Sequence, residues 1–461
     1  MKEIHEQLKA LLGPGGVVES PPISAVGNWR GHPYNSLLLL RPETTEQVAA
    51  ILRLCNQHQQ AIVVHGGLSG MVGGTSSGRD EICLSLERMQ KVESIDKLGR
   101  TMTVEGGVRL QEVQEAAAAE GLFFALDLGA RGSATIGGNI ATNAGGNQVI
   151  RYGMAREQVL GLEVVLADGT ILSSLNHLLK NNAGYDLKQL FIGSEGTLGI
   201  VTKAVLRLRP AMPARNTALI GTDQFDKLPR LLSHIESALG GKLSAFETIW
   251  DNYYQLATQG PHLGAPPLAQ RHPYYALIES TGSDAEAEAE VFLAALEGAL
   301  NAGLIDDAVL AKSAKEQDAL WAIRDNIDSL AAIAPVIIFD VGLPIGVMEA
   351  YLKHIEAELK SQLGLTQLAV FGHLGDSNLH IVVGTETEDI EVYHRIEDIL
   401  YAPLQALGGS ISAEHGIGLE KKRYLHYSRN AEEIATMQLL KRTFDPNNIL
   451  NPGKVVDLLK H

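Results

Sequence analysis

The sequence predicts an α+β protein with more than one domain. Its 461 residues exceed the roughly 250–300 residues that one hydrophobic core usually spans. Short apolar segments typical of strands alternate with segments whose apolar residues recur at helical spacing. Glycine is frequent, with 47 residues, and gathers in three clusters before residue 200. Together these observations indicate a loop-rich first domain followed by a domain of different character.

The first domain is expected to cover residues 1–210. Helices are predicted at Met1–Leu12 and, after a capping box formed by Thr44 and Gln47, up to about His58. An alanine-rich helix ends at Gly121. Short apolar runs predict strands at Ala61–Val64, Ile82–Leu86, Thr101–Glu105, Leu162–Leu166 and Ile200–Leu206.

A second domain is expected over residues 211–422, where glycine clusters are rare. It has helical patterns at Asp284–Ala302 and Val347–Leu363, and a strand–turn–strand pattern at Leu368–Val383 that favours an antiparallel sheet. A further helical pattern runs from Glu414 to about Arg442, and a turn-rich segment follows at Phe444–Gly453. Residues 423–461 are expected to return to the first domain and pack there.

Charge and cysteine content exclude some classes of function. The net charge is −16, from 38 basic and 54 acidic residues, which disfavours nucleic acid or an anionic membrane as a partner. Only Cys55 and Cys83 are present, and no apolar run approaches the 18 or more residues of a membrane span. We therefore expect a reduced, cytoplasmic protein.

The three glycine clusters cover residues 65–75, 127–146 and 193–199. None contains the G-x-G-x-x-G fingerprint of a nicotinamide site or a P-loop. Consecutive glycines let backbone N–H groups converge on a phosphate, and Ser69, Thr75 and Ser133 add hydroxyl donors. The first two clusters could hold one diphosphate between them, although glycine runs also mark tight turns in β-rich domains.

Two histidines flank a Gly-Asp-Ser-Asn turn in residues 371–383. The apolar strands on either side should bring His373 and His380 together at a hairpin. Two imidazoles and a carboxylate form the ligand set of catalytic zinc sites, and Glu414 is the candidate carboxylate. The histidine spacing alone often arises by chance, but His415, next to Glu414, is well placed as a general base.

These residues resemble the FAD-linked oxidases of the vanillyl-alcohol-oxidase fold, particularly D-lactate and D-2-hydroxyglutarate dehydrogenases and the FAD subunit of glycolate oxidase. The resemblance runs nearly end to end, and it implies a PCMH-type FAD-binding domain of two subdomains plus an α+β cap domain with an antiparallel sheet. Leu68, where relatives usually have Asn, and Val64-His65, where they often have Pro-Gln, depart from the pattern. The resemblance implies non-covalent FAD, held by Gly66, Gly67, Leu68, Ser69, Gly70, Met71, Leu128, Gly129, Ser133, Ile136, Gly137, Asn139, Ala141, Thr142, Gly145, Gly196 and Ile200. Asn451 is expected to reach the flavin edge or to form a plain turn.

The same family carries G-H-x-G-D-x-N-x-H and S-x-E-H-G-x-G as metal and catalytic motifs. The resemblance therefore implies a divalent metal, Zn²⁺ or alternatively Mn²⁺ or Fe²⁺, on His373, His380 and Glu414, with His415 taking the substrate's hydroxyl proton while hydride passes from Cα to flavin N5. Arg324, in a Leu-Trp-x-x-Arg sequence, corresponds to an arginine that contacts substrate, and a guanidinium suits a carboxylate. From the residues alone, the favoured interpretation is a surface arginine on an amphipathic helix.

The substrate implied is a small (R)-2-hydroxy acid. The 2-hydroxyglutarate enzymes have a hydroxyl, a lysine and an asparagine where this chain has Asp328, Ile338 and Val382. Apolar side chains there favour lactate, 2-hydroxybutyrate or a longer apolar acid, because an unpaired buried charge is costly. A dicarboxylate such as 2-hydroxyglutarate or malate is the alternative.

Two other functions fit parts of the pattern. One is a metal-free oxidase or reductase of the same fold, such as an alditol oxidase or an enolpyruvyl-sugar reductase, and the histidine set argues against it. The other is a non-catalytic subunit of a glycolate-oxidase-like complex. For the dehydrogenase, we expect an electron-transfer flavoprotein or a quinone as acceptor, and a homodimer is possible.

Overall fold

The computed structural model describes residues 2–21, 35–259 and 266–458, which divide into two compact units. Unit 1 comprises residues 1–146, 152–211 and 414–461, and unit 2 comprises 147–151 and 212–413. The structure thus assigns 147–151 to unit 2 and returns the chain to unit 1 at Glu414, earlier than the expected residue 423. No helix in the described ranges is long and apolar enough to span a membrane.

Unit 1 contains a four-stranded sheet with the order β1-β2-β4-β3. Strands β2 and β3 run parallel to β4, and β1 is antiparallel to β2. Its core is closed by two helices and by Ile449 and Leu450 from the end of the chain. The elements are α1 Lys2–Leu12, β1 Val17–Glu19, β2 Leu38–Leu40, α2 Thr45–Gln57, β3 Ile62–His65 and β4 Ile82–Ser85.

The predicted cap of α2 is present in a modified form. The Thr44 hydroxyl accepts from the Gln47 N–H at 3.3 Å, and the Gln47 side chain accepts from the N–H of Glu43 rather than that of Thr44, at 2.7 Å. Both bonds satisfy backbone donors ahead of the first helical turn. They fix the point at which the chain leaves β2 and enters the helix.

A five-stranded antiparallel sheet forms the other part of unit 1, in the order β5-β6-β10-β8-β9. Short helices and the small β7–β11 pair surround it. The predicted strands and the alanine-rich helix are confirmed to within a few residues. The elements are β5 Val92–Asp96, β6 Thr101–Glu105, α3 Leu110–Ala119, β7 Leu122–Phe123, α4 Ile136–Ala141, α6 Ala155–Gln158, β8 Val159–Val165, β9 Ile171–Ser174, α7 Lys188–Phe191, β10 Ile200–Arg207 and β11 Arg209–Pro210.

The continuous helix predicted from Glu414 to about Arg442 is wrong in its first half. Gly416 and Gly418 adopt left-handed conformations (φ +85° and +52°), which interrupt a right-handed helix. The chain forms a turn there, then the 3-10 helix η4 Lys422–Tyr427 and the α-helix α15 Ala431–Phe444.

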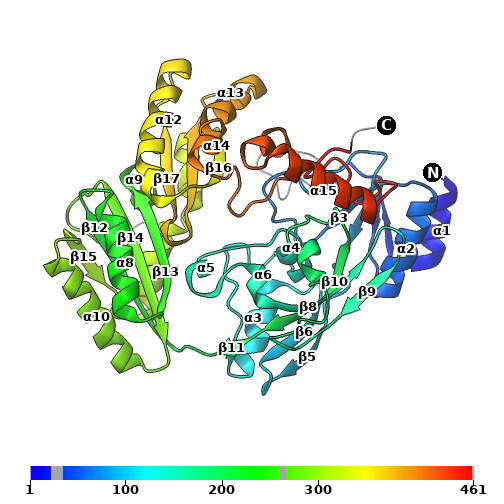
Figure 1. Ribbon diagram of the computed structural model, residues 1–461, viewed down its shortest axis with the longest axis horizontal. Helices are drawn as coiled ribbons and strands as arrows, with labels where there is room; N and C mark the ends of the chain where they lie inside the picture. The colour runs from blue at the N-terminus through cyan, green and yellow to red at the C-terminus, as the bar shows by residue number, and fades with distance from the viewer. Residues whose placement is uncertain (1, 22–34, 260–265, 459–461) are drawn as a thin grey trace. The chain divides into compact units, whose positions relative to one another are not determined.

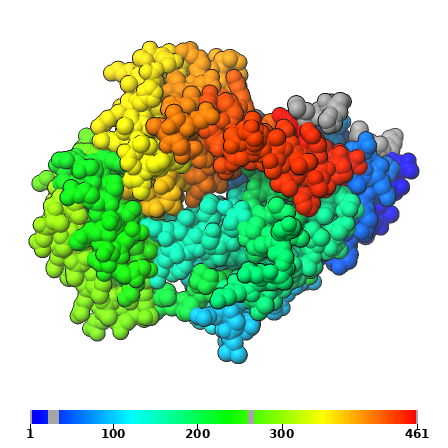
Figure 2. Space-filling model, viewed as in Figure 1, coloured from blue at the N-terminus to red at the C-terminus, as the bar shows by residue number. Residues whose placement is uncertain are grey.

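The end of the chain packs within unit 1, as its apolar, turn-rich sequence predicts. Ile62 in β3 donates to the Ile449 carbonyl at 2.7 Å, and its own carbonyl accepts from Asn451 at 2.8 Å. The rings of Phe191 and Phe444 lie 5.8 Å apart. In Figure 2 the red atoms of this segment lie against teal and blue atoms of the same unit.

Unit 2 is built on a seven-stranded antiparallel sheet in the order β15-β12-β14-β13-β17-β18-β16. Helices α8 and α10 pack side by side on it (Figure 1). Helices α9, α11 and η1 join a core with β13, β17 and β18. The predicted helices at 284–302 and 347–363 and the hairpin at 368–383 are confirmed. The elements are β12 Ala214–Thr222, α8 Lys227–Leu239, β13 Leu243–Trp250, α9 Asp251–Thr258, β14 Tyr274–Gly282, α10 Ala285–Asn301, β15 Asp307–Leu310, α11 Ala314–Arg324, η1 Ile327–Ile333, β16 Val336–Gly342, η2 Ile345–Val347, α12 Met348–Leu363, β17 Leu368–His373, η3 Leu374–Asp376, β18 Asn378–Gly384, α13 Ile390–Tyr401 and α14 Leu404–Leu407; the short helix α5 Val149–Tyr152 precedes them in the chain.

Candidate functional site

The first two glycine clusters meet at backbone distance in unit 1. A Cβ on Gly67 would lie 1.9 Å from the Ser133 carbonyl oxygen, and one on Gly66 would lie 2.8 Å from the Thr135 hydroxyl. The approach to backbone excludes any side chain at 67, so glycine is required there, whereas a side chain at 66 would displace the Thr135 hydroxyl. The structure therefore brings together the two segments that the sequence predicts to share one diphosphate.

The third cluster joins the same region through α4. The Gly193 N–H donates to the Ile140 carbonyl at 3.0 Å, and the Glu195 N–H donates to the Ala141 carbonyl at 2.7 Å. Several predicted FAD residues thus lie on segments that surround one short helix. Ile136 and Ile200 are each 1% exposed and belong to the hydrophobic cores, so only their backbones are available to a ligand.

Unit 1 has polar atoms and free space that suit a polar ligand in this region. The Asn139 amide nitrogen and the Ser76 hydroxyl are buried and lack a hydrogen-bond partner among the described residues. A Cβ on Gly70 or on Gly129 would meet no atom within 4 Å. An unmatched buried amide calls for a ligand or water, and glycine-rich backbone at this point fits FAD.

Asn451 has a structural role that its sequence position did not reveal. Its side-chain oxygen accepts from the Val64 N–H at 2.8 Å, and its amide donates to the Glu195 carbonyl at 2.7 Å. The residue is 4% exposed and has a positive φ of +42°. It links β3 to the third glycine cluster, and contact with the flavin edge remains a prediction.

A half-buried carboxylate, that of Glu195, holds the turn that carries Glu414 and His415. Glu195 accepts from the backbone N–H groups of Ile417 at 2.7 Å and Gly418 at 2.9 Å, and its burial raises its pKa. One oxygen of Glu414 accepts from the Gly146 N–H at 2.8 Å. In the sequence Glu195 is only one member of the third glycine cluster, and no local pattern there indicates this role.

In unit 2, β17 and β18 bring His373 and His380 together as the hairpin predicts. Their ring centroids are 5.3 Å apart, and a ring nitrogen of one lies within 4.8 Å of a ring nitrogen of the other. The two side chains are 4% and 7% exposed. His380 pairs with Phe371 in the strand register, so the two histidines lie on one face of the sheet.

Glu247 of β13 connects His373 to Arg324. Its carboxylate oxygens lie 2.6 Å from His373 Nδ1 and 2.8 Å from Arg324 Nε, and Arg324 Nη2 lies 3.1 Å from His373 Nε2. Burial alone would raise the pKa of Glu247, but its contacts with His373 and Arg324 hold that pKa below its ordinary value. Arg324 is 7% exposed, which rules out a surface arginine.

Asp340 and Asn378 add polar groups beside His380. Asp340 is opposite His380 in the β16–β18 register, with a carboxylate oxygen within 4.8 Å of a His380 ring nitrogen. Its Oδ2 accepts from the Ser412 hydroxyl and the Ala413 N–H, both at 3.2 Å. Asn378, two residues before His380, is 2% exposed, and neither polar atom of its side chain has a hydrogen-bond partner within the described part of the chain. Such an amide suits a metal-bound or polar ligand.

The positions that bear on substrate choice are close to these histidines. Ile338 and Val382 are direct cross-strand partners, two residues along each strand from the Asp340–His380 pair and on the same face. Val382 is fully buried, whereas Asp328 in η1 is exposed. At these two positions beside His380 the sheet is therefore apolar and provides no cation.

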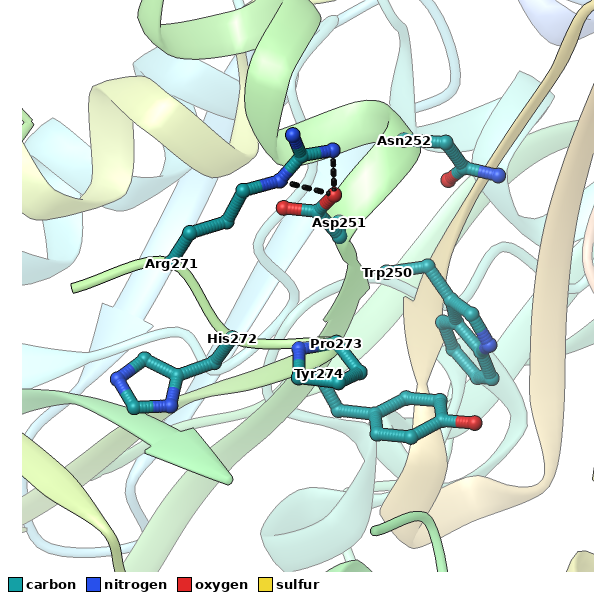
Figure 3. Close-up of a pocket in the computed structure, with 7 residues that line it drawn as sticks. All are labelled: Trp250, Asp251, Asn252, Arg271, His272, Pro273 and Tyr274. Atoms are coloured by element: carbon teal, nitrogen blue, oxygen red, sulfur yellow. Dashed lines mark hydrogen bonds and ion pairs between the residues drawn. The ribbon is translucent and has the colours of Figure 1, made fainter. Parts of the chain in front are cut away.

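A separate hollow in unit 2 lies at the start of α9. It has a volume of about 480 Å³ and is lined by Trp250, Asp251, Asn252, Arg271, His272, Pro273 and Tyr274. Figure 3 shows Arg271 bound to Asp251 on one side and the rings of Trp250 and Tyr274 together on the other, with the His272 ring turned away from them. It contains none of the predicted site residues, and we do not assign the reaction to it.

Two family models match the chain. "FAD binding domain" matches residues 36–174, and "FAD linked oxidases, C-terminal domain" matches residues 211–455. A probable mitochondrial D-2-hydroxyglutarate dehydrogenase of Oryza sativa subsp. indica is 40% identical, over 97% of this chain and 80% of the relative. The Rattus norvegicus D-2-hydroxyglutarate dehydrogenase is 41% identical over 91% and 78% of the two chains. A putative mitochondrial D-lactate dehydrogenase of Schizosaccharomyces pombe is 38% identical over 91% and 81%.

Solved structures share the fold at low sequence identity. p-Cresol methylhydroxylase with bound substrate matches with a TM-score of 0.78 at 15% identity, over 100% of this chain and 98% of that one. Alkyldihydroxyacetonephosphate synthase matches with a TM-score of 0.74 at 19% identity, over 98% and 84%. The predicted fold, a PCMH-type FAD-binding domain with an α+β cap domain, is confirmed. By both family models and by these relatives, the chain belongs to the family of FAD-linked oxidases.

Proposed function

We propose that this FAD-dependent 2-hydroxyacid dehydrogenase oxidises an (R)-2-hydroxy acid with an apolar side chain to the 2-oxo acid, with the help of a divalent metal. The observation that carries the proposal is the buried group of His373, His380, Glu247 and Arg324 in unit 2. It combines imidazole nitrogens suited to Zn²⁺, Mn²⁺ or Fe²⁺ with a guanidinium suited to a carboxylate.

The residues present fit a divalent metal and FAD. His373 and His380 would hold the metal together with Glu414, which follows directly after Ala413, the residue whose N–H is bound to Asp340. The glycine segments of unit 1 would hold FAD. When bound, the metal lowers the pKa of the substrate hydroxyl, and FAD accepts the hydride from Cα.

The chain's own residues supply binding and proton transfer. Arg324 would bind the substrate carboxylate through the N–H groups that Glu247 does not occupy. His415 would accept the hydroxyl proton as general base. The unmatched Asn378 amide supports a polar ligand at this point, since it has both a donor and an acceptor to offer.

We propose an apolar side chain for the substrate because Ile338 and Val382 are apolar. The facing pair beside His380 would leave a second carboxylate without a cation, which is unfavourable in a buried site. A dicarboxylate is the second candidate, because several relatives with 38–41% identity are named D-2-hydroxyglutarate dehydrogenases. For the electron acceptor we propose an electron-transfer flavoprotein or a quinone.

The reaction is tested by anaerobic spectroscopy of the FAD- and metal-loaded protein. A panel of (R)- and (S)-2-hydroxy acids with short, apolar and dicarboxylic side chains is added, and the flavin absorbance at about 450 nm is followed. We expect bleaching by one enantiomer of the short or apolar acids. Preferential bleaching by a dicarboxylate would favour the second candidate, and no bleaching by any acid would contradict the dehydrogenase proposal.

The metal assignment predicts the behaviour of His373→Ala. Loss of one imidazole should remove the metal from the purified protein, while FAD stays bound through unit 1. Because altering an outer partner of a metal ligand already costs about 10–100-fold, turnover should fall further than that. Metal content by mass spectrometry and flavin content by absorbance give the two readouts, and a variant that retains metal and activity would remove His373 from the site.

A further inference from the structure

We infer that Glu247 is a positioning residue that holds His373 with its proton on Nδ1, so that the Nε2 lone pair is available to the metal, and that also fixes Arg324. This inference rests on the proposed function and deepens it. Neither the sequence motifs nor the histidine spacing point to Glu247, because it lies 126 positions before His373.

The hydrogen-bond pattern fixes the tautomer of His373. A carboxylate accepts, so Glu247 Oε1, at 2.6 Å, requires a proton on Nδ1. An arginine only donates, so Arg324 Nη2, at 3.1 Å, faces a lone pair on Nε2. Both contacts therefore select the same neutral ring, and a ring in this state can bind a metal through Nε2.

The sheet makes this arrangement rigid. Glu247 and His373 are directly opposite each other in the β13–β17 register, so their side chains leave the same face of adjacent strands. Glu247 is 1% exposed, and its second oxygen is bound to Arg324 Nε at 2.8 Å. The carboxylate thus has two fixed partners and no access to alternative ones in solvent.

The same carboxylate would keep Arg324 in place when Nε2 is used by a metal. Arg324 Nη2 must then leave His373, whereas its Nε remains bound to Glu247 Oε2. The released N–H groups become available to the substrate carboxylate. Glu247 thereby couples the metal ligand to the carboxylate-binding residue without contacting the substrate itself.

The test compares Glu247→Gln with Glu279→Gln in the FAD-loaded protein. Glutamine has the same shape as glutamate, but its NH₂ group only donates, so it cannot accept from both His373 and Arg324. Glu279 is the matched control: it is 3% exposed in the adjacent strand β14, where it accepts from Trp321 Nε1 at 2.7 Å and from Thr217 at 3.2 Å. It contacts neither histidine through these bonds.

We expect Glu247→Gln to weaken Zn²⁺ affinity by about 10–100-fold, measured by chelator competition. The Zn²⁺ affinity of Glu279→Gln should stay within about twofold of the wild-type value. In the metal-free protein, ¹⁵N NMR of selectively labelled histidine should show His373 leaving the Nδ1–H form in Glu247→Gln only, with His373→Gln identifying its signals. Glu247→Asp, which keeps a carboxylate, should retain part of the affinity that Glu247→Gln loses.

An unchanged tautomer in Glu247→Gln, or equal Zn²⁺ affinity in the two glutamine variants, would overturn the inference. Failure of the proposed function is distinguishable, because it would appear in the wild-type protein, as flavin that no hydroxy acid bleaches. The tautomer measurement uses metal-free protein and decides the role of Glu247 in either case.

Discussion

Leu68 is a bulky residue in a left-handed backbone conformation within the first glycine cluster. Its φ is +55°, where an L-residue other than glycine pays about 1–2 kcal/mol and asparagine pays less. We expect Leu68→Asn to raise the free energy of unfolding by about 0.5–1 kcal/mol, measured by urea denaturation. Leu68→Ala removes the same side chain without favouring the conformation, so equal stability of the two variants would contradict this account.

His65 should make the protein less stable in mild acid. Burial lowers its pKa from 6.5 to about 4, so as pH falls the unfolded chain takes up the proton before the folded one does. Stability is therefore lost between about pH 6.5 and pH 4, by roughly 2 kcal/mol at pH 5 and roughly 3 kcal/mol in full. His65→Gln can still donate to the Thr75 carbonyl, which lies 3.0 Å from His65 Nε2, and it does not titrate.

The measurement is urea unfolding of wild type and His65→Gln at several pH values between 7 and 5. The free energy of unfolding of His65→Gln should rise steadily relative to that of the wild type as the pH falls. Parallel pH profiles would show that His65 takes up its proton equally in the folded and unfolded states.

The sequence reveals residues in motifs better than residues in partner strands. His373, His380 and the glycines stand in local patterns whose chemistry can be read directly. Glu247 and Asp340 could not be found this way, because only the sheet register places them opposite His373 and His380. The sequence shows only that each is an acidic residue in an apolar strand. This indicates a buried carboxylate with a partner, but it does not identify the partner.

At the scale of elements, the end of α15 is tied to unit 1 by a buried lysine. Lys441 is 3% exposed and donates to the Thr197 and Leu450 carbonyls at 2.9 and 2.7 Å and to the Asp445 carboxylate. Asp445 also accepts from the Ile449 and Leu450 N–H groups. One ion pair thus organises the turn after the helix.

Lys441→Met should lower the free energy of unfolding by about 3–5 kcal/mol, because it leaves the buried Asp445 carboxylate without its cation. Urea denaturation measures the change. Arg442→Met is the control from the next position of the same helix, with an expected change of about 0.5 kcal/mol or less. A loss below about 1 kcal/mol in Lys441→Met would show that backbone donors alone satisfy Asp445.

Element boundaries were predictable where periodicity and caps agree, as at Asp284 and Ala302, which cap α10. The prediction failed after Glu414, where apolar spacing suggested a helix that Gly416 and Gly418 interrupt. Positive φ at a glycine is a backbone property that apolar periodicity does not detect. The turn that it creates carries two of the predicted site residues.

At the scale of the whole molecule, the residues predicted to bind FAD and the metal are divided between the two units. Every residue predicted to bind FAD lies in unit 1, whereas two of the three predicted metal ligands, His373 and His380, lie in unit 2. A ligand stabilises the state that binds it, by about 2.7 kcal/mol at 100 times its dissociation constant. Each ligand should therefore protect a different set of amides from exchange.

Hydrogen exchange followed by mass spectrometry separates the two effects. FAD added to flavin-free protein should slow exchange in residues 65–75 and 127–146, whereas Zn²⁺ should slow it in 371–381. His373→Ala should abolish the Zn²⁺ effect and leave the FAD effect intact, because FAD is assigned to the other unit. If FAD instead protected 371–381 as strongly as the glycine clusters in this variant, the hairpin would itself depend on flavin, and the division of ligand binding between the units would be wrong.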